Sequence, residues 1–166
     1  MLKKILSFLA GIVFLVALDQ LAKYWVLKVL KPHGPIPLIP GVLELSYVEN
    51  RGAAFGILQN KLWFFLAITL LILALMLWIY PRIPEEGRFL PLRLTVIFIV
   101  AGALGNMIDR IGRGYVVDFI YFKLINFPVF NVADIYVTCS AFVLAFLLLF
   151  FYKEEDIDRI FHAGKG

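Results

Sequence analysis

Four long apolar segments limit what this sequence can fold into. They cover about residues 5–26, 62–80, 93–111 and 130–152. Each is close to the roughly 20 residues that a helix needs to cross the hydrocarbon core of a bilayer. Because unpaired backbone groups are costly in lipid, single segments of this length cross a membrane as α-helices. The sequence therefore predicts an α-helical integral membrane protein with four transmembrane helices.

The composition of the 166-residue chain agrees with a membrane protein. Hydrophobic residues make up 62% and charged residues only 17%, whereas soluble domains carry roughly a quarter charged residues. The formal charge of +4 does not indicate a nucleic-acid partner, because the basic residues stand singly beside the apolar segments and form no patch. We expect one membrane-embedded domain, residues 1–166, present as a monomer and surrounded by membrane lipids.

Cysteine and histidine are too scarce to indicate a metal site or a cofactor. Cys139, the single cysteine, lies inside the last apolar segment, and the two histidines, His33 and His162, stand near opposite ends of the chain. Neither a disulfide nor a set of metal ligands follows from these positions. We therefore expect no bound metal and no cofactor.

The connections between the apolar segments indicate a small sheet and a surface segment. Residues 32–58 separate the first two segments, and within them residues 43–47 alternate apolar and polar side chains as a strand does. Residues 50–52 are a turn by composition, and we expect residues 53–55 to form a return strand. Residues 119–128 are too short to span, so we expect a short interfacial helix there.

An even number of spans places both termini on one side of the membrane, but the positive charges do not clearly say which side. With the N-terminus in the cytoplasm, eight of the sixteen basic residues fall on each side. Lys3 and Lys4 precede the first span, where positive charge usually dominates orientation. The charged tail, residues 153–159, also suits a cytoplasmic end. We expect both termini in the cytoplasm and an extracytoplasmic sheet.

Asp118 and Asp134 stand sixteen positions apart in apolar surroundings. An ionised carboxylate is costly at membrane depth and is therefore usually functional. Asp118 lies in the connection between the third and fourth segments, and Asp134 lies about one turn into the fourth. Because a helix rises about 1.5 Å per residue, both carboxyls reach the same membrane face. Two carboxyls at one apolar site push each other's pKa values apart, as an acid–base pair requires.

Further polar residues are expected at the same face. Most are paired at a spacing of three or four along a helix. They are Asp19 with Lys23, Asn106 with Arg110, Asn131 with Asp134, and in addition Asp109 and Asn50. Two carboxyls ringed by amides and an arginine can hydrolyse a peptide bond. One carboxylate takes a proton from water, while the other, protonated, polarises the scissile carbonyl.

Five short segments together resemble one known family. They are Leu18-Asp19-Gln20-x-x-Lys23, Asn50-x-Gly52-Ala53-Ala54-Phe55, Gly102-Ala103-Leu104-Gly105-Asn106-x-x-Asp109-Arg110, Gly114-Tyr115-Val116-Val117-Asp118-Phe119 and Phe130-Asn131-Val132-Ala133-Asp134. Each is weak alone, but in this order among four spans they are highly specific. On these motifs, over nearly the whole chain, the sequence is similar to the bacterial lipoprotein signal peptidases (signal peptidase II).

The resemblance implies an intramembrane aspartic endopeptidase that needs no metal, with Asp118 and Asp134 as its catalytic dyad. Other motif residues are implied to support the dyad or to contact substrate: Asp19, Lys23, Asn50, Gly52, Asn106, Asp109, Arg110 and Asn131. The implied substrate is a prolipoprotein whose lipobox cysteine already carries diacylglycerol, cut just before that cysteine. The implied location is the bacterial cytoplasmic (inner) membrane, with the active site near the outer leaflet.

Simpler interpretations exist for several of these residues. Asp118 can be an exposed loop acid, and Asp134 can be a helix cap. Asp19 with Lys23 can be a purely structural pair. Asp109 can pair with Arg110 or with another basic neighbour.

A proton-coupled small membrane transporter is an alternative from another class, since transporters also use intramembrane acids. Their sites lie near the bilayer midplane, often at broken helices and inverted repeats. Here the acids gather at one face, no internal repeat is visible, and a sheet-forming segment lies over that face. A purely structural protein would give no reason to bury so many acids. The pattern therefore favours the peptidase.

Overall fold

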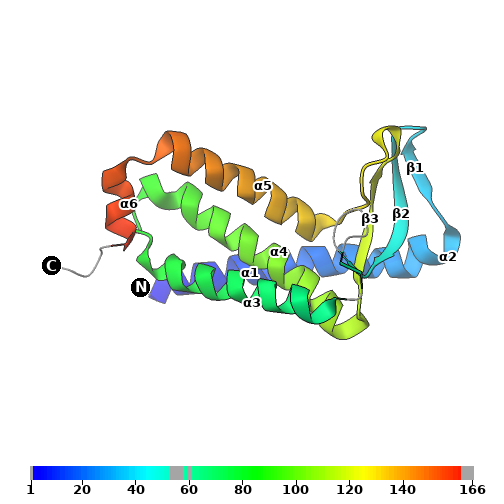
Figure 1. Cartoon of the computed structure of the whole chain (residues 1–166), viewed down its shortest axis with the longest axis horizontal. Helices are drawn as coiled ribbons and strands as arrows, with labels where there is room; N and C mark the ends of the chain where they lie inside the picture. Colours follow the sequence, from blue (N-terminus) through cyan, green and yellow to red (C-terminus); the bar gives the residue numbers. More distant parts are fainter. Residues whose placement is uncertain (1, 53–57, 60, 162–166) are drawn as a thin grey trace.

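The computed structural model describes residues 2–52, 58–59 and 61–161. Within this part of the chain, four helical segments are long and apolar enough to cross a membrane: Leu2–His33, Leu62–Arg82, Gly87–Arg113 and Val132–Phe151. The four predicted spans are thus confirmed. The first is longer than predicted, because its helix continues beyond the apolar segment to His33. Figure 1 shows the helices running in the same general direction, with the strands gathered at one end.

The spans consist of α-helices with short π-helical or 3-10 extensions. In chain order, the elements of the spans are α1 (Leu2–Trp25), a π-turn (Val26–Leu30), α2 (Lys31–His33), α3 (Leu62–Ile79), two 3-10 turns (Tyr80–Arg82 and Gly87–Phe89), α4 (Leu90–Arg113), α5 (Val132–Phe146) and a second π-turn (Leu147–Phe151). Helix α6 (Glu154–Phe161) comes after them. The short helix α6 follows the last span and was not predicted.

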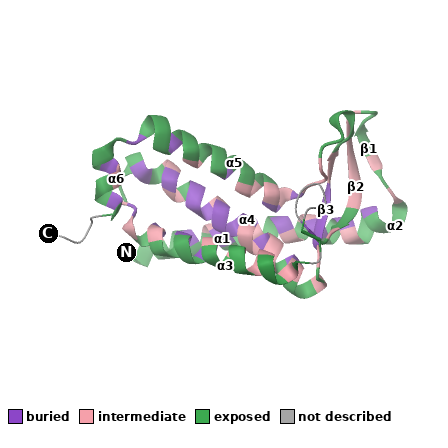
Figure 2. Cartoon of the chain, in the orientation of Figure 1, coloured by how far each residue is buried: buried purple, intermediate pink, exposed green. Residues whose placement is uncertain are grey.

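Helix α4 is the centre of the bundle. It packs against α1, α3 and α5, and 56% of its most apolar stretch is buried, against at most 17% in the other three spans. Figure 2 shows this difference as a run of buried residues along α4, whereas α3 and α5 are exposed over much of their length. Those exposed apolar faces are what a helix presents to lipid, since lipid replaces water as the surrounding solvent.

Glycine on α4 lets two neighbouring helices approach the future site closely. A Cβ placed on Gly105 would lie 2.6 Å from Asp19 Oδ2, and one placed on Gly102 would lie 2.6 Å from the Ala133 carbonyl oxygen. Small residues at such positions are how membrane helices come into backbone contact. Here they bring polar groups of α1 and α5 against the same helix.

Among the described residues, three antiparallel strands form the sheet, in the order β1 (Ile36–Ile39), β2 (Leu43–Asn50) and β3 (Val116–Phe122). The predicted strand at residues 43–47 is confirmed and extends to Asn50. The predicted return strand at residues 53–55 lies outside the described residues. The sheet packs on the extension of α1, where Val26 and Leu30 are fully buried together with Val117 of β3.

The predicted interfacial helix at residues 119–128 is wrong for most of that segment. Residues 119–122 complete β3, and Lys123–Ile125 form only one turn of 3-10 helix. The reason is pairing across a long sequence separation: Leu43 lies opposite Phe122, and Asn50 lies opposite Val116. Local composition does not reveal such pairing, because the partner strand is contributed from about 70 residues earlier.

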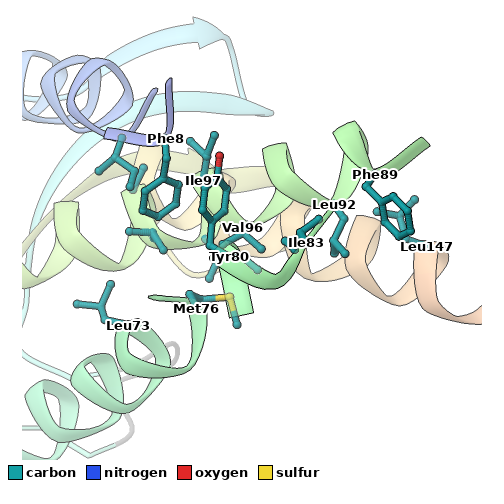
Figure 3. Close-up of a cluster of buried hydrophobic side chains, with 14 of the residues drawn as sticks. Phe8, Leu73, Met76, Tyr80, Ile83, Phe89, Leu92, Val96, Ile97 and Leu147 are labelled. Atoms are coloured by element: carbon teal, nitrogen blue, oxygen red, sulfur yellow. The ribbon is translucent and has the colours of Figure 1, made fainter. Parts of the chain in front are cut away.

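An apolar core closes the end of the bundle opposite to the sheet. Phe8 of α1 stacks on Tyr80, with ring centroids 3.9 Å apart, and both are buried. Figure 3 shows these two rings beside Ile97 of α4. Helix α6 closes the same end, because Arg88 donates to both Asp156 oxygens, at 2.9 and 2.7 Å. The start of α1 and the helix α6 therefore lie together, away from the sheet (Figure 1).

Candidate active site

Asp118 is the third residue of β3, and its carboxyl is buried beneath the sheet. Only 1% of the residue is exposed, so it is not the exposed loop acid of the simpler interpretation. Asn50, at the end of β2, donates its side-chain amide to Asp118 Oδ2 at 2.8 Å. Asn131 donates its side-chain amide to Asp118 Oδ1 at 2.6 Å. Both carboxyl oxygens thus accept a hydrogen bond from an asparagine.

Asp134 is held at the N-terminus of α5 by a capping box. The Asp134 backbone N–H donates to Asn131 Oδ1 at 3.0 Å, and the Asn131 backbone N–H donates to Asp134 Oδ2 at 3.1 Å. Asn131 is the N-cap residue and Asp134 completes the capping box from the third helical position, so Asp134 takes part in helix capping, as the simpler interpretation holds. The cap occupies only one carboxyl oxygen, because Oδ1 accepts from the Asn106 side-chain amide at 2.7 Å. Capping and catalysis do not exclude each other at this position.

The two aspartates meet because β3 binds the residue just before the α5 cap. Phe130 forms an isolated bridge with Ile120, and its carbonyl oxygen accepts from the N–H groups of Phe119 and Ile120 at 3.0 and 2.8 Å. Asn131 follows directly, and it donates its side chain to Asp118 and its backbone N–H to Asp134. One residue therefore bridges both carboxyls.

Three asparagines present their NH2 groups to the carboxyls, and each amide is fixed in orientation by a group that can only donate. The Asn50 oxygen accepts from the Gly52 N–H at 2.9 Å. The Asn131 oxygen accepts from the Asp134 N–H, and the Asn106 oxygen accepts from the Lys23 ammonium at 2.9 Å. Because backbone N–H and ammonium groups cannot accept hydrogen bonds, none of these amides can rotate by 180° without losing a bond.

A buried ion network lies behind the dyad and is centred on Lys23. The Lys23 ammonium lies 2.9 Å from Asp19 Oδ2 and 3.2 Å from Asp109 Oδ2, and all three side chains are fully buried. Asp109 also pairs with Arg113 rather than with its sequence neighbour Arg110. The predicted pair of Asp19 and Lys23 is confirmed as an ion pair.

The same network fixes the backbone beside each aspartate of the dyad. Asp19 accepts from the Ala133 N–H at 3.0 Å, and Ala133 directly precedes Asp134. Asp109 accepts from the Val117 N–H at 3.0 Å, and Val117 directly precedes Asp118. The lysine thus holds two carboxylates, and each of these anchors one half of the dyad.

An open cleft of about 360 Å³ gives access to both aspartates. Asp118, Asp134, Asn50, Asn106 and Gly52 line it, together with Arg110 of α4. The Arg110 guanidinium lies over the Phe65 ring, 4.6 Å from its centroid. Phe65 comes from α3, so α3, α4 and α5 all contribute walls to the cleft.

Burial and like charge act on the Asp118 carboxyl. Burial in the apolar site, together with the neighbouring Asp134 charge, raises the pKa of Asp118 from 3.8 to about 7. The hydrogen bonds from Asn50 and Asn131 and the charge of Lys23 oppose this rise. A carboxyl with a pKa near neutrality can hold a proton that its partner lacks, which is the requirement for acid–base work on a water molecule.

Every predicted site residue lies in this region: at the cleft, in the ion network behind it or, for Asn131, buried between the two carboxyls. Several contributors were not predicted, among them Gln20 and Phe65. Gln20 donates to Asp19 at 3.1 Å and to the Gly105 carbonyl at 3.1 Å. Its position within the Leu18–Lys23 motif could have indicated that it belongs to the site. Phe65 had no signal, because an aromatic residue in a span usually faces lipid or packs in the core.

Comparison with known proteins shows the family. A profile of the family described as signal peptidase (SPase) II matches residues 11–150. The chain belongs to the signal peptidase II family.

Relatives and solved structures of similar proteins agree with this assignment. The lipoprotein signal peptidase of Caldanaerobacter subterraneus subsp. tengcongensis is 46% identical over 84% of this chain and 93% of its own length. The lipoprotein signal peptidase of Streptococcus pyogenes serotype M6 is 39% identical over 90% of this chain and 95% of its own length. A bacterial membrane enzyme solved by the in meso method at 2.3 Å superposes with a TM-score of 0.77, at 35% identity over 86% of this chain and 87% of that one.

Signal peptidase II membership confirms the predicted enzyme class, a membrane-embedded peptidase of the aspartic type. The transporter alternative is not favoured. The described geometry also gives the family motifs a physical role, because residues from three helices and two strands converge on the same two carboxyls.

Proposed function

We propose that Asp118 and Asp134 are the catalytic dyad of this signal peptidase II. The observation that carries the proposal is the bridging position of Asn131, which donates its side chain to Asp118 and its backbone N–H to Asp134. This arrangement holds two carboxyls at one buried site that opens into a cleft. Two groups of residues support the dyad. The amide network consists of Asn50, Asn106 and Asn131, and the ion network consists of Asp19, Lys23 and Asp109. Arg110 and Gly52 lie at the wall of the cleft.

One proton is shared by the dyad, and we assign it to Asp118. The pKa of Asp118, raised to about 7 by burial, favours the protonated form there. Asp134 carries the negative charge, because it accepts a backbone N–H at a helix N-terminus, where an anion is favoured. The pair titrates as a unit, so its proton belongs to both carboxyls during the reaction.

The hydrolytic step follows from this assignment. Asp134 takes a proton from water as the water oxygen attacks the scissile carbonyl carbon, and Asp118 gives its proton to the carbonyl oxygen. The resulting diol collapses when Asp134 returns its proton to the leaving amine and Asp118 takes a proton from one hydroxyl. The products are a carboxylic acid and an amine, and the dyad is left in its starting state.

The substrate is a prolipoprotein whose lipobox cysteine carries diacylglycerol, and the bond before that cysteine is cut. Three features support this choice. The relatives are named lipoprotein signal peptidases. The cleft lies at the sheet end of the bundle, where a bond near the membrane surface would reach it. Its walls come from α3 and α5, which flank α4 (Figure 1), so a lipid-anchored peptide would enter sideways between them.

We infer that the chain lies in the bacterial inner membrane, with both termini in the cytoplasm and the sheet outside. The start of α1 and helix α6 lie at the same end, opposite to the sheet (Figure 1), as this topology requires. Lys3 and Lys4 at that end agree with the preference of cytoplasmic flanks for positive charge. The dyad then lies near the outer leaflet.

The test uses purified protein with a lipidated and an unlipidated prolipoprotein. We expect cleavage of the lipidated form alone, no effect of a chelator, and loss of cleavage in Asp118→Asn and in Asp134→Asn. Asp158→Asn is the matched control, because it removes a carboxylate from α6 at the far end of the bundle, and it should cleave normally. Normal cleavage by either dyad variant would remove the basis of the assignment.

A further inference from the structure

A groove of about 630 Å³ lies between α1 and α4, at the end of the molecule opposite to the sheet. Its volume falls within the range of small-molecule clefts, roughly 300–1,000 Å³. No residue of the dyad, the amide network or the ion network lines it. The proposed peptidase reaction therefore does not account for this groove.

The groove is charged at one end and apolar along the rest of its length. Three cations line the charged end, Lys3, Lys4 and Arg93, with one acid, Glu85. The apolar walls are Gly11, Phe14, Leu15, Leu94, Ile97 and Phe98. Three positive charges against one negative charge favour an anion at the mouth, and the apolar walls favour a hydrocarbon beyond it.

Two of the cations are held at the mouth by backbone carbonyls and keep donors to spare. The Lys4 ammonium donates to the Pro81 carbonyl at 2.9 Å and to the Ile83 carbonyl. Arg93 donates to the Pro84 carbonyl at 3.0 Å. An ammonium has three N–H donors and a guanidinium has five, so these bonds orient the cations without exhausting them. Lys3 is exposed to the surroundings at the same end.

The length of the groove matches one leaflet of a bilayer. From Lys4 to Phe14 is ten residues, so α1 rises by about 15 Å between them. The hydrocarbon core of a bilayer is about 30 Å thick, and half of it is therefore about 15 Å. A ligand with its head at Lys4 and its tail at Phe14 would extend from the membrane surface to the midplane.

We propose that this groove is a binding site for an anionic phospholipid, with its phosphate at Lys3, Lys4 and Arg93 and an acyl chain along Phe14 and Phe98. Basic pockets between transmembrane helices are where anionic headgroups bind. A zwitterionic lipid fits the apolar walls equally well but lacks the net negative charge that the three cations at the charged end favour. On the proposed topology the site faces the cytoplasmic leaflet.

The test measures lipid binding to the purified full chain by native mass spectrometry, with phosphatidylglycerol and phosphatidylcholine of identical acyl chains. We expect one molecule of phosphatidylglycerol to bind to each chain, and to bind more tightly than phosphatidylcholine. Each cation near an anionic headgroup contributes about fivefold in affinity, so Lys3→Gln with Arg93→Gln should weaken phosphatidylglycerol binding about 25-fold. The matched control, Lys28→Gln with Lys153→Gln, removes the same charge away from the groove and should leave binding unchanged.

A third variant tests whether an acyl chain lies in the groove. Ser7 lines it, and Ser7→Trp fills the path of the chain while leaving all three cations in place. We expect this variant to lose phosphatidylglycerol binding, with thermal unfolding in lipid-free detergent used to confirm that it folds. Three results would each overturn the proposal: equal binding of the two lipids, equal weakening by the control pair, or competition by inorganic phosphate as strong as by phosphatidylglycerol.

Discussion

The Lys23 ammonium nitrogen lies 2.9 Å from Asn106 Oδ1, and this contact, with the hydrogen bond that Asn131 donates to the same oxygen, fixes which end of the Asn106 amide faces Asp134. A buried lysine on the first span therefore controls a hydrogen bond between the third and fourth spans. Because Lys23 also holds Asp19 and Asp109, it is joined to both halves of the dyad. Its position suits a residue that orients the catalytic groups without touching substrate.

Replacement of Lys23 by methionine should reduce both activity and stability. The Asn106 oxygen would keep only the hydrogen bond from the Asn131 side chain, at 3.1 Å, so the amide beside Asp134 would be held less firmly. Misplacement of a catalytic group costs about 10²-fold in rate. Loss of one partner from a buried ion network costs about 3–5 kcal/mol. Both effects can be measured, by prolipoprotein cleavage and by thermal unfolding in detergent. Lys28→Met, at an exposed position, should change neither.

A double variant separates the two effects of Lys23. Lys23→Met with Asp19→Asn leaves Asp109 paired with Arg113 and removes the unpaired charge. Stability should recover in part, whereas activity should stay low because Asn106 still lacks the hydrogen bond from Lys23. Recovery of both together would show that Lys23 serves stability alone.

Asn131 combines a cap with an amide donor, and two substitutions distinguish these roles. Asn131→Ser keeps a good capping side chain but removes the donors to Asp118 and Asn106. Asn131→Ala removes both, at a further cost of about 1 kcal/mol for the lost cap. We expect cleavage to be low in both variants and thermal stability to be higher in the serine variant. Near-normal cleavage by Asn131→Ser would mean that the amide donor to Asp118 is dispensable.

The raised pKa of Asp118 makes activity and stability depend on pH. With a pKa of about 7 in the folded protein and 3.8 as the unperturbed value, the folded state binds more protons than the unfolded state between these limits. Stability must therefore fall as pH rises from about 4 to about 7 and level off above. The melting temperature of wild type relative to Asp118→Asn should show this fall. A difference that does not vary over that interval would contradict the shift.

The rate of cleavage should fall as pH rises above the pKa of Asp118. Above pH 7 Asp118 loses the shared proton, and the dyad can no longer protonate the scissile carbonyl oxygen. The charge of Lys23 opposes the rise in the pKa of Asp118, so the alkaline limb of Lys23→Met should lie at higher pH than that of wild type. A purely structural lysine would leave the position of the limb unchanged.

The glycines of α4 offer a test of close packing at the site. A Cβ on Gly105 would lie 2.6 Å from Asp19 Oδ2, whereas one on Gly112 would meet nothing within 4 Å. Gly105→Ala should lower stability by about 1–3 kcal/mol through overpacking and also reduce cleavage. Gly112→Ala should be neutral or stabilising, because alanine is the better helix former. Equal melting temperatures for the two variants would contradict the close approach of Asp19.

Local sequence patterns gave the spans, the pair of Asp19 and Lys23, and the shared location of the two aspartates. These features depend on segment length and on helical spacing, and both are properties of neighbouring residues. The carboxyl pair was predictable for the same reason, since Asp118 and Asp134 flank one short connection. The substrate came from the family resemblance and could not be derived from the residues.

The sheet pairing and the networks could not be predicted locally. Residues 119–122 are apolar and aromatic enough for an interfacial helix, but the open hydrogen-bonding edge of β2 makes them a strand. The sequence also did not determine which basic residue pairs with Asp109. The packing of α1 on α4 brings Lys23 to it. The helix α6 forms where Arg88 and Asp156 meet across 68 residues.

By itself, the sequence determined that this chain crosses the membrane four times and carries two costly acids at one face, because lipid imposes length and apolarity on every span. Only the tertiary structure decided that Asn131 joins those acids and that Lys23 orients the amide beside them. Hydrogen bonds and ion pairs act over about 3 Å, and only the folded chain brings residues from separate helices and strands within that distance.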